Sequence, residues 1–330
     1  MTSDRLFGMI TLALYLVSAA LGISVAGPAS AQDYPQKLIR MIVPGGAGGP
    51  ADILARVVAQ RLQGALGQSV IVENIPGAGG MIAARTVARA APDGHTLFFG
   101  NTTTLAIIPA ISKSPGYDPR EHFVAVAKIA DTFQVLVVER ASAMKSVPDL
   151  IARAKANPGQ LNIGAVHATL PHLAAELFKS KAGIDIVSVT YKTEPENMTA
   201  LLSKQIQLSF PNVTTALPLV EQGTLKALAV TSTTPRPQFP GVPTMIESGV
   251  DDYEAASFFG VVAPAGTPTA IVNKLNLTIN QGLSSNEVQS SLAKFGAYAS
   301  PGTPQAFAAF IAAETQKWTT VAATAGMRID

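Results

Sequence analysis

A glycine-rich loop is the part of this sequence best suited to bind a ligand. Residues 45–49 follow a buried apolar run and precede Pro50, which suits the first position of a helix. A helix N-terminus carries unpaired N–H groups and a positive dipole end, and glycine lets a ligand approach the backbone. The pattern predicts an anion-binding loop that needs no charged side chain. The alternative is a tight turn in which Asp52 stabilises the first turn of the helix.

The same loop fits a second chemistry. Gly46, Gly48 and Ala51 match the weak dinucleotide fingerprint, and Glu73 ends the next predicted strand, where a ribose-binding acid would lie. An exported NAD(P)-binding oxidoreductase is therefore an alternative function. Three features count against it: a general export signal, no candidate hydride-transfer residues, and a second glycine run at residues 76–80.

Other catalytic and metal-binding chemistry has little support. The chain has no cysteine, which excludes disulfides, thiolate zinc sites and cysteine nucleophiles. His167 and His172 are five residues apart with Pro171 between them, and on one helix they would diverge by about 140°, a poor metal pair. No Gly-x-Ser-x-Gly elbow is present. We therefore predict no catalytic residue, no metal site, no cofactor and no enzymatic activity.

The charge balance points away from nucleic acid. The 24 Lys and Arg nearly match the 22 Asp and Glu, giving a net charge of +2, and no basic run is present. Binding to phosphates requires clustered basic side chains. Charged residues make up 14% of the chain and hydrophobic residues 48%. The composition is typical of a folded protein with a large core.

The first 31 residues read as a secretory signal. Arg5 precedes an uncharged, mostly apolar run over residues 6–27, and Ala29-Ser30-Ala31 provides an Ala-x-Ala cleavage site. The run is also long enough to remain as an uncleaved membrane anchor. The small residues at the cleavage position favour removal, so we expect a soluble mature protein in the periplasm.

The elements that must position the glycine loop follow an alternating pattern. Short β-branched runs alternate with helical periodicity, which predicts an α/β fold with parallel sheets. The expected strands are 38–43, 70–73, 96–99, 134–138, 161–164, 186–190, 206–210, 225–231 and 258–263. The expected helices begin at Pro50 and cover 81–90, 147–156, 173–182, 197–204, 214–222, 270–283, 286–295 and 304–325.

The helix-dominated C-terminal region needs a sheet to pack on, and the first sheet is the natural host. We therefore expect two lobes, each a mostly parallel sheet flanked by helices. Lobe 1 would comprise 32–134 and 258–330, and lobe 2 would comprise 135–257. Two crossing strands, near residues 132–135 and 256–259, would form the hinge of a type II-like periplasmic-binding-protein fold.

Several motifs in order resemble one family, the Bug-type substrate-binding proteins of tripartite tricarboxylate transporters. The motifs are Leu38-Ile39-Arg40-Met41-Ile42-Val43-Pro44-Gly45-Gly46, Val72-Glu73-Asn74, Pro76-Gly77-Ala78-Gly79-Gly80, Ala91-Pro92-Asp93-Gly94-His95, Pro240-Gly241-Val242-Pro243-Thr244 and Ala263-Pro264-Ala265-Gly266-Thr267-Pro268. The resemblance implies a two-lobed solute-binding protein that closes over a small organic acid and presents it to membrane permease subunits. A ligand-sensing role for a membrane receptor is equally compatible.

The resemblance also implies which residues bind the ligand, mainly through backbone N–H groups, small polar side chains and water. In lobe 1 these are Gly45, Gly46, Ala47, Gly48, Gly49, Asn101, Thr102 and Thr103. In lobe 2 they are Gly164, His167, Ala168, Thr169, His172, Tyr191, Thr193 and Asn212. Each group lies at the carboxyl end of a predicted strand, where open α/β sheets bind ligands.

Three departures from the family pattern bear on the ligand. His167 stands where a small residue is usual, Pro211 replaces an Asp, and Glu194 and Glu196 follow Thr193. If Glu194 points inward, it would repel a dicarboxylate and favour a ligand with a cationic, neutral or hydrogen-bond-donating end. We favour the alternative, in which both acids cap the following helix and face solvent. The expected ligand is a mono- or dicarboxylate, a class that includes aromatic acids and amino acids, and we expect a monomer to bind it.

Overall fold

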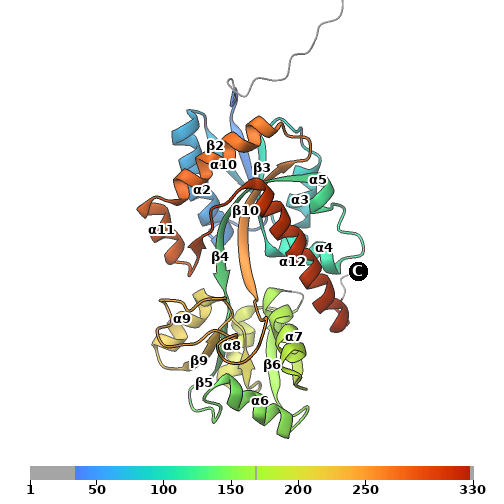
Figure 1. Cartoon of the computed structure of the whole chain (residues 1–330), viewed down its shortest axis with the longest axis vertical. Helices are drawn as coiled ribbons and strands as arrows, with labels where there is room; N and C mark the ends of the chain where they lie inside the picture. Colours follow the sequence, from blue (N-terminus) through green and yellow to red (C-terminus); the bar gives the residue numbers. More distant parts are fainter. Residues whose placement is uncertain (1–33, 168, 328–330) are drawn as a thin grey trace, which may run out of the picture. The chain divides into compact units, whose positions relative to one another are not determined.

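The computed structural model describes residues 34–167 and 169–327, which form two β-sheets flanked by helices (Figure 1). The predicted signal segment, residues 1–31, lies outside the described residues. The first sheet has the strand order β11 (Tyr298–Ala299), β4 (Phe123–Phe133), β10 (Ala256–Pro264), β3 (Thr96–Asn101), β1 (Ile39–Val43) and β2 (Val70–Asn74). The second has the order β7 (Val187–Tyr191), β6 (Asn162–Val166), β8 (Leu208–Ser209), β5 (Val135–Glu139) and β9 (Leu225–Val230).

Helices from both ends of the chain pack on the first sheet, as the C-terminal helical pattern predicts. They are α2 (Pro50–Leu66), η2 (Ala78–Gly80), α3 (Met81–Ala88), η3 (Thr103–Ile107), α4 (Ile108–Ile111), α5 (Pro119–His122), α10 (Thr269–Leu283), α11 (Asn286–Ala293) and α12 (Pro304–Thr324). Helices α10 and α12 both contact β4, and α10 also contacts α2. The second sheet carries α6 (Val147–Ala156), α7 (Leu170–Ala182), α8 (Glu194–Leu202) and α9 (Val213–Glu221).

Helix α2 illustrates how local sequence sets an element. Pro50 occupies the first helical position, and Leu54, Val58 and Leu62 place a buried apolar stripe on the sheet. The helix ends at Gly67, whose φ of +69° is the left-handed conformation that glycine adopts readily. These features hold the N-terminus of α2 next to the glycine-rich loop.

Two of the five strand pairs in the first sheet and two of the four in the second are parallel, which corrects the expectation of mostly parallel sheets. Strand β1 pairs parallel with β2 and β3, and β6 pairs parallel with β7 and β8. The strands near the crossings pair antiparallel: β10 with β3 and β4, and β5 with β8 and β9. Both sheets are therefore mixed, because the crossing strands run against their neighbours.

The chain passes between the two sheets at two adjacent places. Strand β4 ends at Phe133, Gln134 follows, and β5 of the second sheet begins at Val135. The chain returns at β10, whose first residue, Ala256, pairs with Phe133. These positions match the predicted crossings, although the sequence pattern did not reveal the full eleven-residue length of β4.

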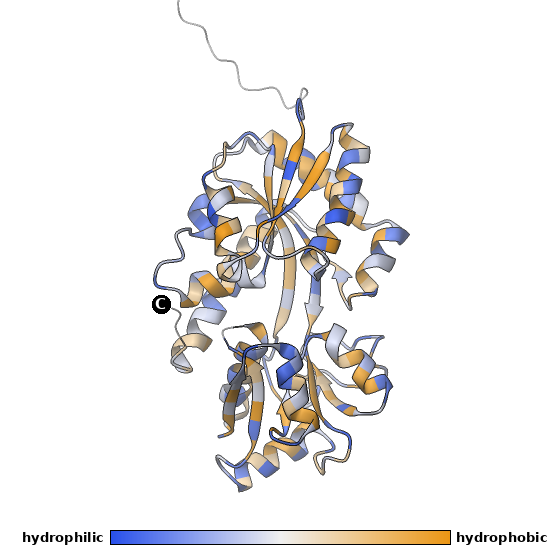
Figure 2. Ribbon diagram, turned by 180° about the vertical axis from the view of Figure 1, so that it is seen from behind, coloured by the Kyte–Doolittle hydropathy of each residue, from blue (hydrophilic) through white to orange (hydrophobic). Residues whose placement is uncertain are grey.

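The core consists of apolar strand residues and buried aromatic rings. Figure 2 shows apolar residues concentrated on the strands and alternating with hydrophilic residues along the helices. In the second sheet region, Phe178, Phe210 and Tyr253 are all fully buried, and the Phe210 and Tyr253 rings stack at 6.1 Å. None of the helices in the described residues is both long and apolar enough to cross a membrane.

Candidate functional site

The carboxyl ends of the parallel strands in both sheets lie on the side where the chain crosses. In the first sheet, Asn101 at the end of β3 pairs with Phe259, close to the start of β10. In the second sheet, Asn212 follows β8 and forms a bridge with Gln134, the residue between β4 and β5. The loops after β1, β3, β6, β7 and β8 therefore lie at the crossing-side edges, where open α/β sheets bind ligands.

The first glycine loop, residues 45–49, is exposed, and the carboxylate of Asp52 stabilises its conformation. Gly46, Ala47 and Gly48 are exposed, and a Cβ built on Gly45, Gly46 or Gly48 would meet open space. The N–H of Gly48 donates to Oδ2 of Asp52 at 2.8 Å. The N–H of Gly48 is therefore bonded within the loop, and its binding to a ligand stays a prediction. The turn stabilised by Asp52 is present, and the rest of the loop stays open to solvent.

Asp52 is 3% exposed and is held as an anion by its partners. Burial alone would raise the pKa of Asp52, but hydrogen bonds from Arg56 and Gly48 outweigh burial and lower the pKa below its usual value. Arg56 lies 2.9 Å from Oδ1 of Asp52, one turn later on α2. The charge at the start of α2 is therefore already balanced within the protein.

The second glycine run supports the first loop by packing. Gly80 has a φ of +97°, and a Cβ there would lie 2.6 Å from Cγ2 of Thr104 and 2.8 Å from Cβ of Pro44. Pro44 immediately precedes the first glycine loop, and Thr104 belongs to η3. Glycine at position 80 thus lets its own segment approach Pro44 and Thr104 closely.

The polar residues after β3 are mainly bonded to the protein. Thr102 is 1% exposed, and its Oγ1 accepts the N–H of Phe258 in β10 at 2.7 Å. Oδ1 of Asn101 accepts the N–H of Thr104 at 3.1 Å. Thr102 therefore links β3 to the crossing strand β10, and its contact with a ligand stays a prediction. Asn101 and Thr103 remain partly exposed.

Glu73, the candidate ribose-binding acid, is engaged elsewhere. Its two carboxylate oxygens accept hydrogen bonds from Nε and Nη2 of Arg40, each at 2.7 Å. These bonds from Arg40 hold the pKa of Glu73 below its usual range. A paired carboxylate is a poor acceptor for ribose hydroxyls, which weighs against the dinucleotide alternative. Over the described residues, no cluster of three His, Asp or Glu residues is arranged to hold a metal ion.

Some predicted site residues at the end of β6 are buried in the protein, and others are exposed to solvent. Gly164 is buried within β6, where a Cβ would clash with Oδ1 of Asn197 and Cδ1 of Ile206, so close packing requires glycine at this position. His167 is exposed at the strand end. Thr169 precedes α7, and its Oγ1 donates to the carbonyl of Val166 at 2.7 Å. Ala168 lies outside the described residues.

His172 is buried beside a second polar cluster. It is 6% exposed, its ring centroid lies 5.6 Å from that of His167, and its Nε2 lies 3.9 Å from Oε1 of Glu176. Burial lowers the pKa of His172, with His167 and Lys179 acting in the same direction and Glu176 opposing them. His172 is therefore mainly neutral at pH 7.

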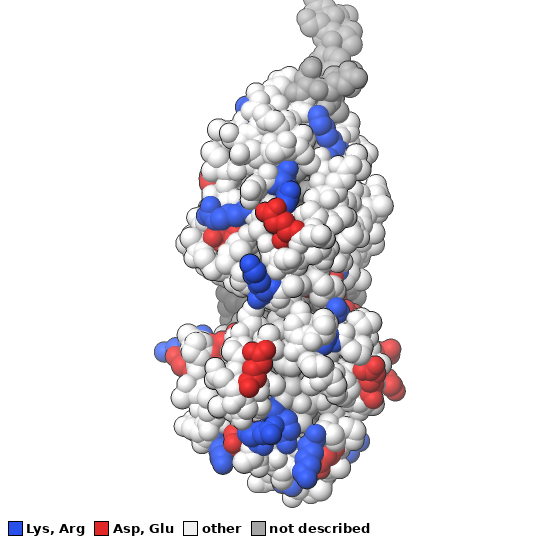
Figure 3. Space-filling view, turned by 90° about the vertical axis from the view of Figure 1, so that its left-hand side faces the viewer, with Lys and Arg blue, Asp and Glu red and all other residues white. Residues whose placement is uncertain are grey.

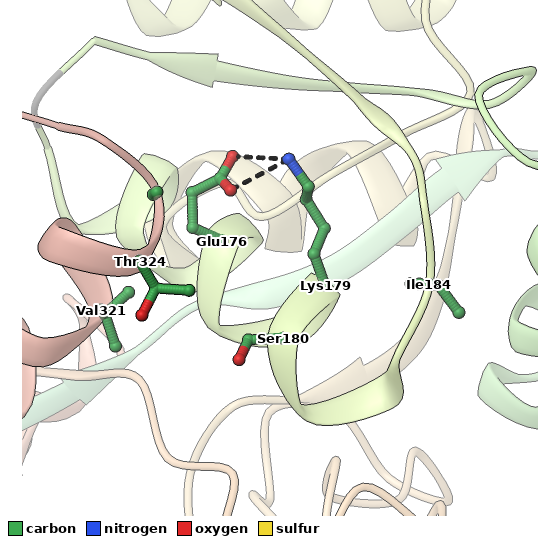
Figure 4. Close-up of a pocket in the computed structure, with 7 residues that line it drawn as sticks. Glu176, Lys179, Ser180, Ile184, Val321 and Thr324 are labelled. Atoms are coloured by element: carbon green, nitrogen blue, oxygen red, sulfur yellow. Dashed lines mark hydrogen bonds and ion pairs between the residues drawn. The ribbon is translucent and has the colours of Figure 1, made fainter.

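A pocket of about 380 Å³ lies between α7 and α12 (Figure 4). Glu176 and Lys179 on α7 form an ion pair of 2.9 Å at its wall, and Val321 and Thr324 on α12 face them. The sequence pattern did not predict this pocket, because its walls come from helices more than 120 residues apart. It contains none of the predicted ligand-binding residues.

The residues after β7 form a helix cap. Oγ1 of Thr193 accepts the N–H of Glu196 at 3.3 Å, and Oε2 of Glu196 accepts the N–H of Lys192 at 3.1 Å. This arrangement is close to a capping box, except that Glu196 bonds to the residue before the N-cap Thr193, and α8 starts at Glu194, three residues earlier than predicted. The hydroxyl of Thr193 is therefore used by the helix. Tyr191 is half-buried at the end of β7.

The side chain of Glu194 points toward Asn212, beside the crossing between β4 and β5. This corrects the expectation that Glu194 and Glu196 both face solvent. Its Oε1 accepts the main-chain N–H of Asn212, and its Oε2 accepts the side-chain Nδ2–H, both at 2.8 Å. Oδ1 of Asn212 accepts a hydrogen bond from Nε2 of Gln134, also at 2.8 Å. Gln134 is not among the predicted site residues, although it is a lone amide within the apolar residues 133–138, which was a usable signal.

Charged side chains are sparse on the face shown in Figure 3, where most of the surface carries neither sign and acidic and basic residues lie near one another. This face has no continuous basic surface of the kind that binds a nucleic acid backbone.

Comparison with known proteins gives consistent matches over most of the chain. A sequence model described as the tripartite tricarboxylate transporter family receptor, TctC, matches residues 54–327. Protein BugT of Bordetella pertussis is 37% identical over 308 residues, covering 92% of this chain and 94% of BugT. The structure of R. palustris Rpa4515 with adipate is 37% identical, with a TM-score of 0.75 over 90% of this chain and 99% of Rpa4515. The periplasmic binding protein BugD is 30% identical, with a TM-score of 0.71 over 89% of this chain and 99% of BugD.

Proposed function

The chain belongs to the tripartite tricarboxylate transporter family of receptors, and we propose that it captures a small organic acid in the periplasm and delivers it to membrane permease subunits. The family membership agrees with the resemblance to Bug-type proteins, and the fold matches that of periplasmic binding proteins. We further propose that lobe 1 comprises 32–134 and 258–330, that lobe 2 comprises 135–257, and that the protein acts as a monomer without a cofactor or enzymatic activity.

The observation that carries this proposal is the position of the strand ends. The loops after β1 and β3 in one sheet, and after β6, β7 and β8 in the other, all lie at the crossing-side edges. A ligand held there contacts both lobes only when they close about the crossing strands. Binding would then favour the closed form, which a permease can distinguish from the open form.

The chemical class of the ligand follows from the first glycine loop and from a relative. The loop offers exposed backbone at Gly46 and Ala47 beside the N-terminus of α2, an arrangement that stabilises negative charge. Rpa4515 has been observed with adipate, a dicarboxylate. We therefore propose that one carboxylate of the ligand lies against this loop, with Asn101 and Thr103 nearby and His167 and Asn212 facing it from lobe 2.

A thermal-shift screen of mono-, di- and tricarboxylates and aromatic acids tests this function, because a ligand that binds the native state raises its Tm. Calorimetry on Gly46→Val then tests the site. Position 46 has open space and no positive φ, so the variant should fold but block approach to the backbone, reducing affinity at least about tenfold. Gly302→Val, also in open space and without a positive φ, is the matched control and should bind normally. Equal affinity of all three proteins would contradict the site.

Delivery to a permease needs its own test. Deleting the gene should abolish uptake of the identified acid while the permease subunits are still produced. Loss of a transcriptional response with uptake intact would instead indicate a sensing role.

A further inference from the structure

The side chain of Glu194 lies where the second sheet meets the crossing strands. Its carboxylate spans the main-chain N–H and the side-chain Nδ2–H of Asn212, with both hydrogen bonds at 2.8 Å. Gln134, fully buried between β4 and β5, donates to the other side of the same amide group at 2.8 Å. Asn212 is therefore hydrogen-bonded on both sides. Through Asn212 and Gln134, the negatively charged carboxylate of Glu194 is linked to the strand crossing between β4 and β5.

The position of this carboxylate is one that suits an anion. Glu194 is in the first turn of α8, and its oxygens bind the residue that precedes α9. Two helix N-termini therefore stabilise the charge. A carboxylate of a ligand approaching lobe 2 would need the same N–H groups of Asn212, which Glu194 already occupies.

The charge of Glu194 is not cancelled by a basic partner. No lysine or arginine within residues 34–167 and 169–327 forms an ion pair with it. The residue is half-buried, so solvent screens its charge only in part. A second carboxylate brought to Asn212 would meet an uncompensated like charge.

We propose that Glu194 takes the place of a second ligand carboxylate and so determines specificity. The preferred ligand is then a small monocarboxylate whose other end is a primary amide, an ammonium or another hydrogen-bond donor. Such a donor can bond to the remaining lone pairs of Glu194, whereas a dicarboxylate is repelled. This inference rests on the proposed function, because it assumes that an organic acid binds at the crossing.

The size of the effect follows from the repulsion between like charges. Two carboxylates about 5 Å apart at an effective dielectric constant of about 20 repel strongly enough to change affinity by more than about tenfold. Glu194→Gln removes the charge with almost no change in shape, and its amide oxygen can still accept the N–H of Asn212. The variant should therefore bind dicarboxylates better by about tenfold or more relative to their monoamides.

A matched control is present in the same helical turn. Glu196 carries the same charge two residues later, but it is exposed and bonded to the N–H of Lys192, not to Asn212. Glu196→Gln should leave the preference between ligands unchanged. A general effect of net charge would appear equally in both variants, whereas a local effect appears only in Glu194→Gln.

The test is isothermal titration calorimetry of the wild type and both variants with two series of acids. One series is adipate, adipamate and 6-aminohexanoate, and the other is succinate, succinamate and 4-aminobutanoate. In at least one series the wild type should bind the amide or amine more tightly than the dicarboxylate, and only Glu194→Gln should reverse or remove that preference.

Two results would overturn the inference while leaving the function in place. One is wild-type binding of a dicarboxylate as tight as that of its monoamide, and the other is an equal change of preference in the two variants. If no acid in the thermal-shift screen or in either series binds the wild type, the proposed function itself fails, and this inference fails with it. Matching Tm values for the three proteins show that all are folded.

Discussion

Trp318 donates its indole N–H to Oε2 of Glu314, one turn earlier on α12, at a distance of 2.9 Å inside the core. Glu314 is 6% exposed, and it also forms an ion pair with Lys317. Burial raises the pKa of Glu314, and the hydrogen bonds and charge of its partners only partly oppose that effect. Because Trp318 is the single tryptophan of the chain, it reports directly on this carboxyl group.

The first prediction is that Trp318 fluorescence titrates with the protonation of Glu314. The pKa of Glu314 in the folded protein lies above its usual value of 4.5, so the emission should change at a midpoint above pH 4.5. In Glu314→Gln this transition should disappear. An unchanged transition in the variant would show that another group causes it.

The same residue predicts a pH-dependent contribution to stability. A folded-state pKa above the unfolded value gives stability that is fully present below pH 4.5 and is lost as the pH rises through the folded-state pKa. The difference in unfolding free energy between wild type and Glu314→Gln should therefore favour the wild type more at pH 4.5 than at pH 7.5. Urea unfolding at both values measures this difference.

A second prediction concerns His172. Its pKa is lowered, whereas that of Glu314 is raised, so its contribution to stability changes with pH in the opposite direction. Burial lowers its pKa in the folded protein below 6.5, so the unfolded chain binds a proton first. The stability associated with neutral His172 should be complete above pH 6.5 and decrease as the pH falls below that value. His172→Gln should reduce this dependence between pH 7.5 and 5.5 in urea unfolding.

The matched comparison for that experiment is His167→Gln, because His167 is exposed at the end of β6. Its removal should change the pH dependence far less. Equal effects of the two substitutions would show that burial of His172 is not the cause.

A third prediction tests the packing between the two glycine runs. Gly80→Ala places a Cβ within 2.8 Å of Pro44 and Thr104 at a φ of +97°. Overpacking and backbone strain together should lower the free energy of unfolding by about 2–4 kcal/mol. Gly64→Ala, in open space within α2, should instead raise it by about 0.5–1 kcal/mol. A neutral Gly80→Ala would mean that the two runs do not support each other.

Local sequence was sufficient for elements with strong periodic signals. Helix α6 has the predicted bounds Val147–Ala156, since Ser146 caps its first turn and Pro148 follows in it. Strand β4 was not recognised, because its sequence contains three alanines, which have low strand propensity. Its strand conformation depends on pairing with β10, a partner more than 120 residues away.

The start of α8 was recoverable from the sequence. Thr193 and Glu196 have the spacing of a capping box, which places the first helical residue at Glu194. A prediction based on apolar periodicity alone began the helix at Asn197. The earlier start matters because it turns Glu194 into a first-turn residue of the helix.

The sequence by itself determined the alternation of strands, loops and helices, and hence that polar and glycine residues follow the strands. Both features depend on hydrophobic periodicity and on turn-forming residues within short stretches of sequence. Only the tertiary structure decided which of those polar groups bond to one another. Asp52 with Gly48 is a local pair, but Thr102 with Phe258 and Asn212 with Gln134 join distant segments. The pairing of buried polar groups depends on which segments the fold brings together, and no local pattern encodes it.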